Sequence, residues 1–410
     1  MTGENLPYLE RPREPLPTLV TTPAQLSALA DSLRRGSGPV AFDAERAHGH
    51  RYHPKAYLFQ LRREGVGTAL IDPIAFEVGG KTDLSLLTDA VGEAEWIVHA
   101  ASQDLPCMLS DRIQPAAIFD TELAARLLNY PGVGLAALVE RHFGLRLRKA
   151  HSADNWSTRP LPQSWLTYAA LDVELLIELR DLLERELLSA GKREWAQQEF
   201  AHVLKSAQPP PEMPDEDRWR RLSGLRDVKH RRGLALARAL WRERESIAAS
   251  LDRPTGRLLP DSGIVALSAP VTDSGPLPSR AELDQVREFG FRGAKRFTQN
   301  WLRAIASVGQ LPRSQWPERN PAHPGPGHPR NWARHHPEAS ARWETTRTAI
   351  DQRAAELDVP PANLIQPAAL REIVFSPPPL PEIEARLSEL GVRPWQIAAV
   401  SEVLRQTLAG

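Results

Sequence analysis

Two carboxylates, Asp43 and Glu45, stand directly after an apolar run at residues 40–42. Such a run is typical of a buried strand, and alternate side chains of a strand face the same way, so the two acids share one face. Two like charges at such a short distance repel each other unless a cation lies between them. The pattern therefore indicates part of a divalent-metal site. The alternative is a solvated strand end that carries two surface acids.

Two further acids stand where they can complete such a site. Asp104 follows a predicted strand and a small-residue turn at residues 98–103 and begins a helix, where the helix dipole alone would favour an acid. Asp172 follows Tyr168 by one helical turn, so the phenol and the carboxylate share a face; surface packing is the ordinary explanation of such a pair. Together the four acids offer enough oxygen ligands for two magnesium ions, which can activate water against a phosphodiester. Tyr168 would orient that water or help to deprotonate it.

The elements around these residues alternate between strand and helix. After the acid-bearing strand, strands are expected at residues 56–61, 68–71, 96–99 and 117–119. Helices are expected near residues 22–36, 84–91, 121–129, 135–143, 162–190 and 193–204. This alternation predicts a mixed sheet with helices on both faces, which begins with an antiparallel meander. The helix at 162–190 would carry Tyr168 and Asp172 on the face that its apolar positions leave free.

Proline-rich stretches divide the rest of the chain. The expected parts are a flexible arm at 1–17, the acid-bearing domain at 18–207, a linker at 208–214, a helical unit at 215–310, a proline-rich linker at 311–335 and a second helical unit at 336–410. A Leu-Asp-x-Pro pattern recurs at 251–254 and 357–360, each time after a predicted helix. It predicts an internal repeat of small helical modules; convergent helix patterning is the alternative.

The composition of the chain says more about its cellular compartment than about its function. The chain of 410 residues has a single cysteine, Cys107, so no internal disulfide can form and a reducing compartment is expected. It has neither a signal-like start nor an apolar stretch near the roughly 20 residues that span a bilayer, so we expect a cytoplasmic protein without membrane contact. Its formal net charge is zero, which gives no global case for nucleic-acid binding. A monomer is the favoured state.

Several motifs resemble those of a known enzyme family. They are Phe-Asp-Ala-Glu at 42–45, Val-His-Ala-Ala-Ser-Gln-Asp-Leu at 98–105, Tyr-Ala-Ala-Leu-Asp-Val at 168–173, and the segments 119–128 and 155–161 between them. With these motifs, residues 19–207 resemble ribonuclease D, in the tyrosine-type branch of the DEDD 3′→5′ exonucleases. The resemblance implies an α/β, ribonuclease H-like exonuclease domain. It also implies a water-holding role for Tyr168 and, as ligands of two Mg²⁺ or Mn²⁺ ions, Asp43, Glu45, Asp104 and Asp172.

Both helical units resemble helicase-and-RNase-D C-terminal (HRDC) domains, which implies two small all-α nucleic-acid-binding modules after the exonuclease domain. Independently of this resemblance, basic residues gather around Trp219, and such a cluster suits a phosphate backbone; a solvated helix face is the alternative. The expected RNA contacts are Arg46, Lys149, Arg159, Arg220, Arg221, Lys229, Arg231 and Arg232. Arg46 stands where many relatives of the family carry an aromatic residue that packs on the terminal nucleotide.

Three polar residues near the acids have structural explanations. His99 is expected to be a buried, hydrogen-bonded histidine, since it lies in the strand before Asp104. Asp120 and Glu122 precede or open a predicted helix, so we expect them to cap it instead of binding metal.

The sequence thus predicts a metal-dependent 3′→5′ exoribonuclease that releases nucleoside 5′-monophosphates from RNA 3′ ends, in tRNA precursors or other structured RNA. One rival is a single-stranded DNA exonuclease on the same scaffold, which contacts to the 2′-hydroxyl would distinguish. The other is a catalytically silent RNA-binding protein that uses the helical units. The intact set of four acids with Tyr168 argues against the silent protein.

Overall fold

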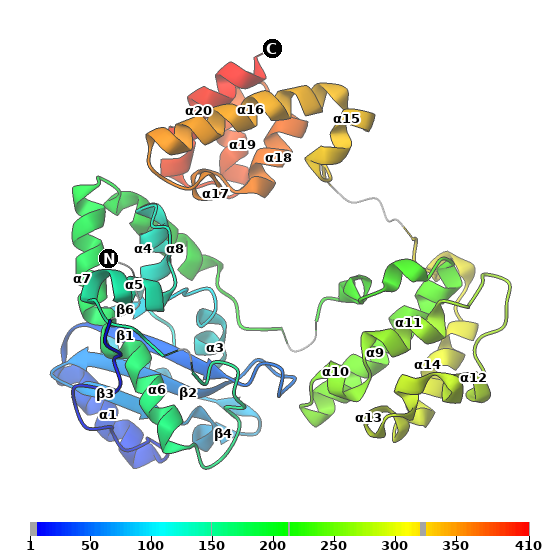
Figure 1. Ribbon diagram of the computed structural model, residues 1–410, viewed down its shortest axis with the longest axis horizontal. Helices are drawn as coiled ribbons and strands as arrows, with labels where there is room; N and C mark the ends of the chain where they lie inside the picture. Colours follow the sequence, from blue (N-terminus) through cyan, green and yellow to red (C-terminus); the bar gives the residue numbers. More distant parts are fainter. Residues whose placement is uncertain (1–5, 149, 212–213, 320–324, 410) are drawn as a thin grey trace. The chain divides into compact units, whose positions relative to one another are not determined.

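The computed structural model describes residues 6–148, 150–211, 214–319 and 325–409, and the chain divides into two units (Figure 1). Unit 1 consists of Met1–Arg46, Ala56–Pro209 and His323–Gly410. Unit 2 consists of Ala47–Lys55 and Pro210–Ala322. Each unit has its own hydrophobic core. Within the described residues, no helix is both long and apolar enough to cross a membrane.

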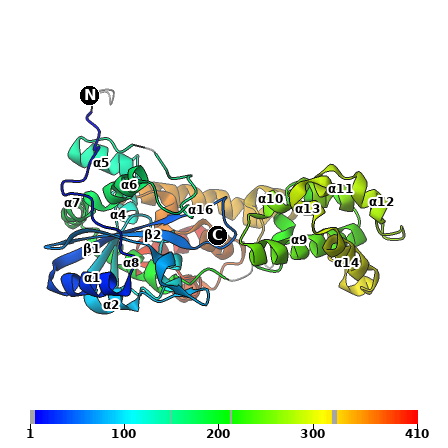
Figure 2. The same cartoon turned by 90° about the horizontal axis from the view of Figure 1, so that it is seen from below.

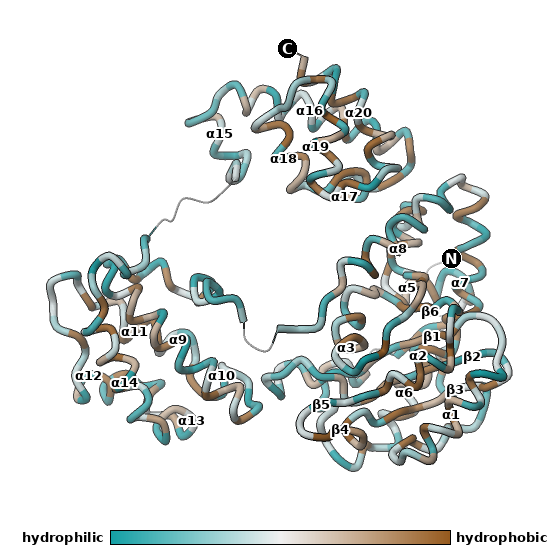
Figure 3. The backbone as a smooth tube through the Cα atoms, turned by 180° about the vertical axis from the view of Figure 1, so that it is seen from behind, coloured by the Kyte–Doolittle hydropathy of each residue, from teal (hydrophilic) through white to brown (hydrophobic). Residues whose placement is uncertain are grey.

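A five-stranded sheet lies at the centre of unit 1, with the acid-bearing strand in its middle. Its strands are β1 (Ser37–Arg46), β2 (Ala56–Glu64), β3 (Gly67–Ile71), β6 (Glu95–Val98) and β7 (Ala117–Asp120), in the order β3-β2-β1-β6-β7. The β1–β2–β3 meander is antiparallel, whereas β6 and β7 run parallel to β1, so the predicted mixed sheet is confirmed. A separate hairpin pairs β4 (Glu77–Val78) with β5 (Lys81–Thr82). In Figure 3 short brown, hydrophobic stretches mark the strand region.

Helices cover both faces of this sheet, as predicted. On one face lie α1 (Pro23–Arg35) and α2 (Ser85–Val91), and across the other runs α6 (Gln163–Glu174), which contacts β1, β2 and β3 (Figure 2). The remaining helical elements of this domain are η1 (Pro73–Phe76), α3 (Leu105–Ser110), α4 (Thr121–Leu127), α5 (Leu135–Phe143), α7 (Leu176–Ser189) and α8 (Arg193–Ser206). The helix that carries Tyr168 and Asp172 thus packs directly on the strand that carries Asp43.

The single helix predicted at 162–190 is wrong, because the chain breaks between α6 and α7. Leu175 has φ −112° and ψ 3°, outside the helical region. Beyond it α7 packs on β1 and β6, whereas α6 lies over β1, β2 and β3. Leu175 and Leu176 are both buried, so the break lets consecutive leucines enter the core where one straight helix would expose one of them.

The two helical regions share a long helix followed by shorter helical elements and a final helix, and unit 2 has one further helix, α12 (Arg280–Gln285), among the shorter elements. Unit 2 contains η2 (Arg218–Arg221), η3 (Leu225–Asp227), α9 (Arg231–Leu251), α10 (Thr255–Leu258), α11 (Asp261–Ser268), α12 (Arg280–Gln285), η4 (Arg287–Gly290), α13 (Arg292–Lys295), α14 (Thr298–Gly309) and η5 (Arg313–Gln315). The C-terminal region of unit 1 contains η6 (Pro329–Asn331), α15 (Trp332–His335), α16 (Pro337–Glu356), α17 (Pro361–Leu364), α18 (Pro367–Phe375), η7 (Leu380–Glu382), α19 (Ile383–Glu389) and α20 (Pro394–Leu408).

The predicted internal repeat is confirmed by the backbone at the recurring motif. The long helices α9 and α16 are each followed by an aspartate at positive φ, Asp252 at 47° and Asp358 at 50°. A short helix then follows in each copy, and the last helix returns against the long one: α14 against α9, and α20 against α16. The Leu-Asp-x-Pro signature therefore marks the same helix end and turn twice.

The predicted linker at 311–335 is too long. Trp332 is buried, and its ring lies 5.6 Å from that of Trp343 and 5.1 Å from that of Phe375, measured between centroids. A buried tryptophan fixes its own segment to the core that it enters, so η6 and α15 belong to the C-terminal helical region despite their proline-rich surroundings.

The predicted flexible arm at 1–17 is likewise bound over the residues that can be described. Leu9 N donates to Arg146 O at 2.9 Å, and Arg146 N donates to Pro7 O at 2.9 Å. Farther along the arm, Arg13 Nε lies 3.0 Å from Glu174 Oε1. Polarity suggested freedom, but these partners lie more than a hundred residues away in the sequence. The first five residues lie outside the described part of the chain.

The C-terminal helical region packs on α8 through a buried polar contact beside an aromatic stack. Trp195 and Trp395 stack with centroids 4.6 Å apart. Beside them the Glu199 carboxylate accepts from Arg393 Nε at 2.7 Å and from Trp395 Nε1 at 2.8 Å. Glu199 and Arg393 are both buried, so each neutralises a charge that would otherwise be costly.

Replacing Glu199 with alanine should lower the free energy of unfolding of unit 1 by about 3–5 kcal/mol, because the Arg393 guanidinium would remain buried without its partner. Urea denaturation of the full chain, followed by tryptophan fluorescence, measures the change. The exposed Gln197→Ala on the same helix is the control. A loss below about 1 kcal/mol, the size expected of an exposed pair, would contradict this account of the contact.

Candidate active site

Three carboxylates converge where α6 crosses β1. Asp43, Glu45 and Asp172 each place an oxygen within 4.8 Å of the other two. The first two reach this point because they alternate along a central strand, and the third because α6 packs across that strand. The structure thus brings together three of the four acids that the sequence predicts as metal ligands.

The fourth acid, Asp104, lies beside this cluster and is paired with an arginine. Asp104 is buried just before α3, and its Oδ1 lies 3.1 Å from Arg46 Nη1. The same guanidinium donates to the Gln103 carbonyl. The negative charge of Asp104 raises the pKa of both Glu45 and Asp172, so it belongs to the same electrostatic field.

Burial acts on all four of these groups, and repulsion by neighbouring acids acts on Glu45, Asp104 and Asp172. Burial raises the pKa of Asp43, of Asp104 and of Asp172. Burial, followed by the charges of its neighbours, raises the pKa of Glu45 to about 10. Carboxylates that resist ionisation in this way are stabilised as anions by a bound cation. The donor set, all hard oxygen, is the one that Mg²⁺ and Mn²⁺ prefer, so these residues fit a divalent ion.

The turn that presents Asp104 is fixed by Asp120. One carboxylate oxygen of Asp120 accepts from Ala100 N at 3.1 Å and the other from Ala101 N at 2.8 Å. It also accepts from Glu122 N at 2.9 Å, which confirms the predicted cap of α4. The bonds of Asp120 to the turn were not predicted, because their only signal in the sequence is a small-residue turn and an aspartate at the end of the next strand. His99 bonds to Thr121 Oγ1 at 2.9 Å, in keeping with the structural role expected of it.

Tyr168 is held by an aromatic cluster at the edge of the site. Its ring centroid lies 6.5 Å from that of Trp156 and 5.7 Å from that of His151. Trp156 is fully buried, and its Nε1 donates to His151 O at 3.0 Å. Burial and then the charge of Asp172 raise the pKa of Tyr168. The phenol therefore stays protonated at neutral pH, which suits it to orienting a water molecule more than to deprotonating it.

Arg159 has a different role from the RNA contact predicted for it. Its Nε and Nη2 donate to the two carboxylate oxygens of Asp72, both at 2.7 Å. Its remaining donors reach the carbonyls of Trp156, Thr158 and Tyr57, each at 2.8 Å. All five N–H donors of the guanidinium are thus used inside the protein. Arg159 fixes the loop that carries Trp156, and so positions Tyr168 indirectly.

The predicted RNA contacts of unit 2 divide into anchored and exposed residues. Arg231 donates to the carbonyls of Pro317 and Trp316, and Arg232 donates to that of Gly275. Arg220 donates to the Glu318 carbonyl at 3.1 Å and lies over the Trp219 ring. These three side chains tie loops to η2 and α9, whereas Arg221 and Lys229 are exposed, and Lys229 Nζ donates to the nearby Arg226 carbonyl at 2.6 Å. Lys149, also predicted to contact RNA, lies outside the described residues.

A pocket of about 310 Å³ opens beside Tyr168 and Asp172. Its other walls come from His151 and Ser164 and from residues 9–11 of the N-terminal arm. The site therefore combines a cluster of buried and half-buried carboxylates, a protonated phenol and an open approach. Such a combination can bind divalent cations and direct a water molecule at a phosphodiester.

Comparisons with known proteins agree with this geometry. A 3′-5′ exonuclease family model matches residues 17–188, and a model of the 3′ to 5′ exonuclease C-terminal domain matches residues 325–408. The ribonuclease D of Gluconacetobacter diazotrophicus is 32% identical over 76% of this chain and 77% of its own length. That of Acidiphilium cryptum is 34% identical over 75% of this chain and 76% of its own.

Two solved structures cover nearly the whole chain. A crystal structure of a protein from Bifidobacterium adolescentis has a TM-score of 0.89 and 34% identity, and covers 99% of this chain and 100% of its own. That of Escherichia coli RNase D has a TM-score of 0.69, covers 96% of this chain and 98% of its own, and is 22% identical, so it bears on the fold alone.

Asp172→Asn should stabilise the protein in EDTA and weaken its response to Mn²⁺. The substitution removes a carboxyl group whose ionisation is opposed by desolvation and by neighbouring acids, but it also removes an oxygen that would carry a negative charge as a metal ligand. In EDTA we expect the melting temperature to rise by about 2–4 °C for each kcal/mol of repulsion relieved, and the rise on adding Mn²⁺ to shrink.

Differential scanning calorimetry measures both changes. The control is Asp89→Asn, which changes an exposed carboxylate on α2 by the same chemistry. A variant that melts lower in EDTA and still gains the full Mn²⁺ stabilisation would show that Asp172 is not a ligand.

Proposed function

Because the chain belongs to the ribonuclease D family of 3′→5′ exoribonucleases, we propose that it removes nucleoside 5′-monophosphates stepwise from RNA 3′ ends, in tRNA precursors or other structured RNA. One observation carries the proposal: the carboxylates of Asp43, Glu45 and Asp172 converge, and a pocket opens beside Asp172 and Tyr168. A silent RNA-binding protein would have no need to keep this cluster of repelling charges buried.

Two divalent cations, Mg²⁺ or Mn²⁺, are proposed to bind to Asp43, Glu45, Asp104 and Asp172. When bound, such ions make a coordinated water more acidic and stabilise the leaving oxygen of a phosphodiester. The fit rests on the all-oxygen donor set and on the raised pKa of each of the four acids, which a cation would reverse. Asp104 would bind only after its carboxylate leaves the Arg46 guanidinium.

The protein groups contribute position and hydrogen bonds. Asp43 and Glu45 are fixed by the central strand and Asp172 by α6, so these carboxylates need little rearrangement before the reaction. The protonated Tyr168 hydroxyl, one helical turn from Asp172, would orient the attacking water toward phosphorus. Arg46, once released from Asp104, would face the terminal nucleotide, where its charge suits a phosphate.

Unit 2 is proposed to act as an HRDC-type accessory module for RNA. Its exposed basic residues, among them Arg221 and Lys229, suit the phosphate backbone. Its anchored arginines instead maintain the loops of the module.

Asp43→Asn should abolish RNA shortening and leave the fold intact, because it removes a ligand charge without changing the shape of the side chain. The test uses 5′-labelled single-stranded RNA with Mg²⁺ or Mn²⁺, and EDTA as the metal-free arm. The wild type should give a ladder that shortens from the 3′ end, and the variant or EDTA should give intact RNA. DNA of the same sequence is the control for the sugar and should be shortened more slowly.

Turnover by Asp43→Asn equal to that of the wild type would contradict the site. Equal rates on RNA and DNA would instead favour the DNA exonuclease. Binding without cleavage, under either metal, would favour the silent protein.

Tyr168→Phe should lower kcat on RNA by about 100-fold with little change in KM, since the hydroxyl acts on the water more than on the bound strand. Tyr130→Phe is a matched control, because its hydroxyl donates to a carboxylate, that of Glu186, at a distance from the site. Steady-state kinetics on a short oligoribonucleotide separate kcat from KM. A variant with unchanged kcat would remove Tyr168 from the mechanism.

A further inference from the structure

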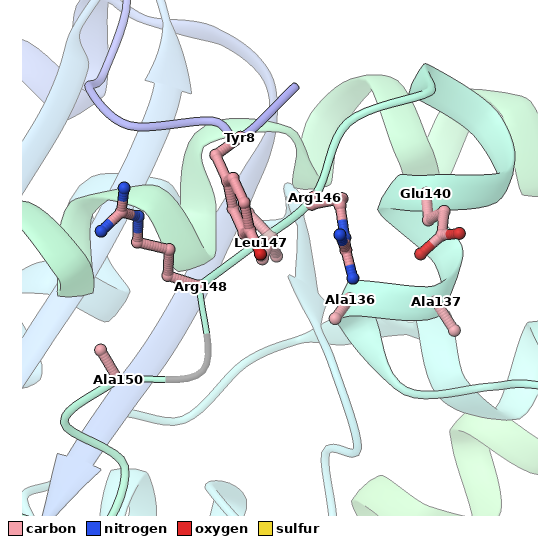
Figure 4. A pocket seen from close by; sticks show the side chains of 8 residues that line it. All are labelled: Tyr8, Ala136, Ala137, Glu140, Arg146, Leu147, Arg148 and Ala150. Carbon is pink, nitrogen blue, oxygen red and sulfur yellow. The ribbon is translucent and has the colours of Figure 1, made fainter. Parts of the chain in front are cut away.

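The pocket at Tyr168 and Asp172 adjoins a second, larger one of about 880 Å³. The two pockets share Leu147, Arg148 and Ala150 as lining residues. The second is further lined by Tyr8, Ala136, Ala137, Glu140 and Arg146 (Figure 4). The two adjoining pockets are together called the arm groove here; their lining extends from Tyr168 and Asp172 to Tyr8 of the N-terminal arm.

The N-terminal arm forms an ordered wall of this groove. Tyr8 forms a parallel bridge with Arg146, supported by the two main-chain hydrogen bonds of Leu9 and Pro7 with that residue. Five residues later, Arg13 Nε lies 3.0 Å from the fully buried Glu174 carboxylate at the end of α6. The arm is thus fixed at both ends of the stretch that lines the groove.

Tyr8 lies between two guanidinium groups. Its ring centroid is 5.3 Å from Arg146 Cζ and 5.2 Å from Arg148 Cζ, and the ring stands between them in Figure 4. Tyr8 is 44% exposed, which is unusual for a large aromatic side chain held in an ordered segment. Arg11 adds a further positive charge to the groove, and the acids near it are Glu10, paired with Arg148 at 2.7 Å, and Glu140.

An exposed aromatic ring between cations is suited to a single-stranded nucleic acid. Bases stack on such rings whatever their identity, and arginines beside them bind the phosphates. A strand whose 3′ end lies at Asp172 must leave the site along some path, and the arm groove adjoins that residue through shared walls. An acidic peptide would meet the same charges but would have no reason to enter the pocket of the carboxylate cluster.

We propose that the arm groove holds the RNA nucleotides 5′ to the scissile phosphate, with phosphates at Arg146 and Arg148 and one base stacked on Tyr8 in place of whichever of these guanidinium groups turns from the ring to its phosphate. The inference rests on the proposed function, since it assigns the path of that same substrate. It makes the N-terminal arm a part of the substrate site and predicts that the enzyme prefers strands long enough to reach Tyr8.

Kinetics on short and long substrates test the path. For Tyr8→Leu, the ratio of kcat/KM on an oligoribonucleotide of about ten nucleotides to that on a dinucleotide should fall roughly tenfold, since stacking is lost only for the longer strand. Tyr8→Phe retains the ring and should keep the wild-type ratio. Leucine preserves apolar bulk for packing, so a merely structural role of Tyr8 would leave the ratio unchanged.

Binding tests the contacts directly. In the Asp43→Asn background, which prevents cleavage, RNA with 2-aminopurine at successive positions should show one position whose fluorescence is quenched with Tyr8 or Phe and not with Leu. Replacing Arg146 with Gln should reduce the slope of log Kd against log salt by about 0.7, the value for one phosphate contact on a single strand. Arg34→Gln, on the exposed part of α1, is the matched control and should leave the slope unchanged.

The outcomes distinguish failure of the proposed function from failure of the arm groove. A wild type that shortens neither substrate would refute the proposed function. A wild type that shortens both, with a Tyr8→Leu ratio and a salt slope of Arg146→Gln equal to those of the wild type, would refute the arm groove and leave the function standing. Tight binding of a poly-glutamate peptide in competition with RNA would assign the groove to acidic peptides instead.

Discussion

The structure depends on keeping four carboxylates together in a buried place. Burial opposes the ionisation of Asp43, Asp104 and Asp172, and the charge of Asp43 further raises the pKa of the other two. A flexible site would relieve this repulsion by moving its acids apart. Here β1 is the middle strand of five and α6 is packed across it, so the scaffold resists that movement. Binding of cations is the remaining way to lower the energy of the site, which couples metal affinity to the rigidity of the fold.

Loops around the cluster are fixed by groups that take no part in ligation. Asp120 accepts two main-chain N–H groups of the turn before Asp104, and Asp72 binds Arg159 under the loop that carries Trp156. In both cases a buried carboxylate satisfies main-chain or guanidinium donors, and the loop gains a single arrangement. The first network positions the candidate ligand Asp104, and the second positions Tyr168.

The parts of this arrangement that follow local rules were predictable. Alternation along a strand placed Asp43 with Glu45, the helical repeat placed Tyr168 with Asp172, and the Leu-Asp-x-Pro pattern revealed the repeated helical modules. Features that depend on distant partners were not. A polar arm, a basic loop residue and a proline-rich linker look alike in sequence whether they are free or bound. In the structure the arm is bound to Glu174, the loop residue Arg159 is bound to Asp72, and the end of the proline-rich segment is held by the core that Trp332 enters.

The contact of Arg13 with Glu174 fixes the distance between the N-terminal arm and the candidate catalytic residues. Glu174 belongs to the same helix as Asp172 and Tyr168, and its carboxylate also lies 3.7 Å from Arg62 on β2. Arg13 therefore attaches the arm to the element that holds two candidate catalytic residues, and not to a separate module. Because α6 is rigid, the spacing between Tyr8 and the carboxylate cluster is set within unit 1. A strand in the arm groove would then advance by whole nucleotides against a fixed stacking site, whatever position the helical unit 2 adopts.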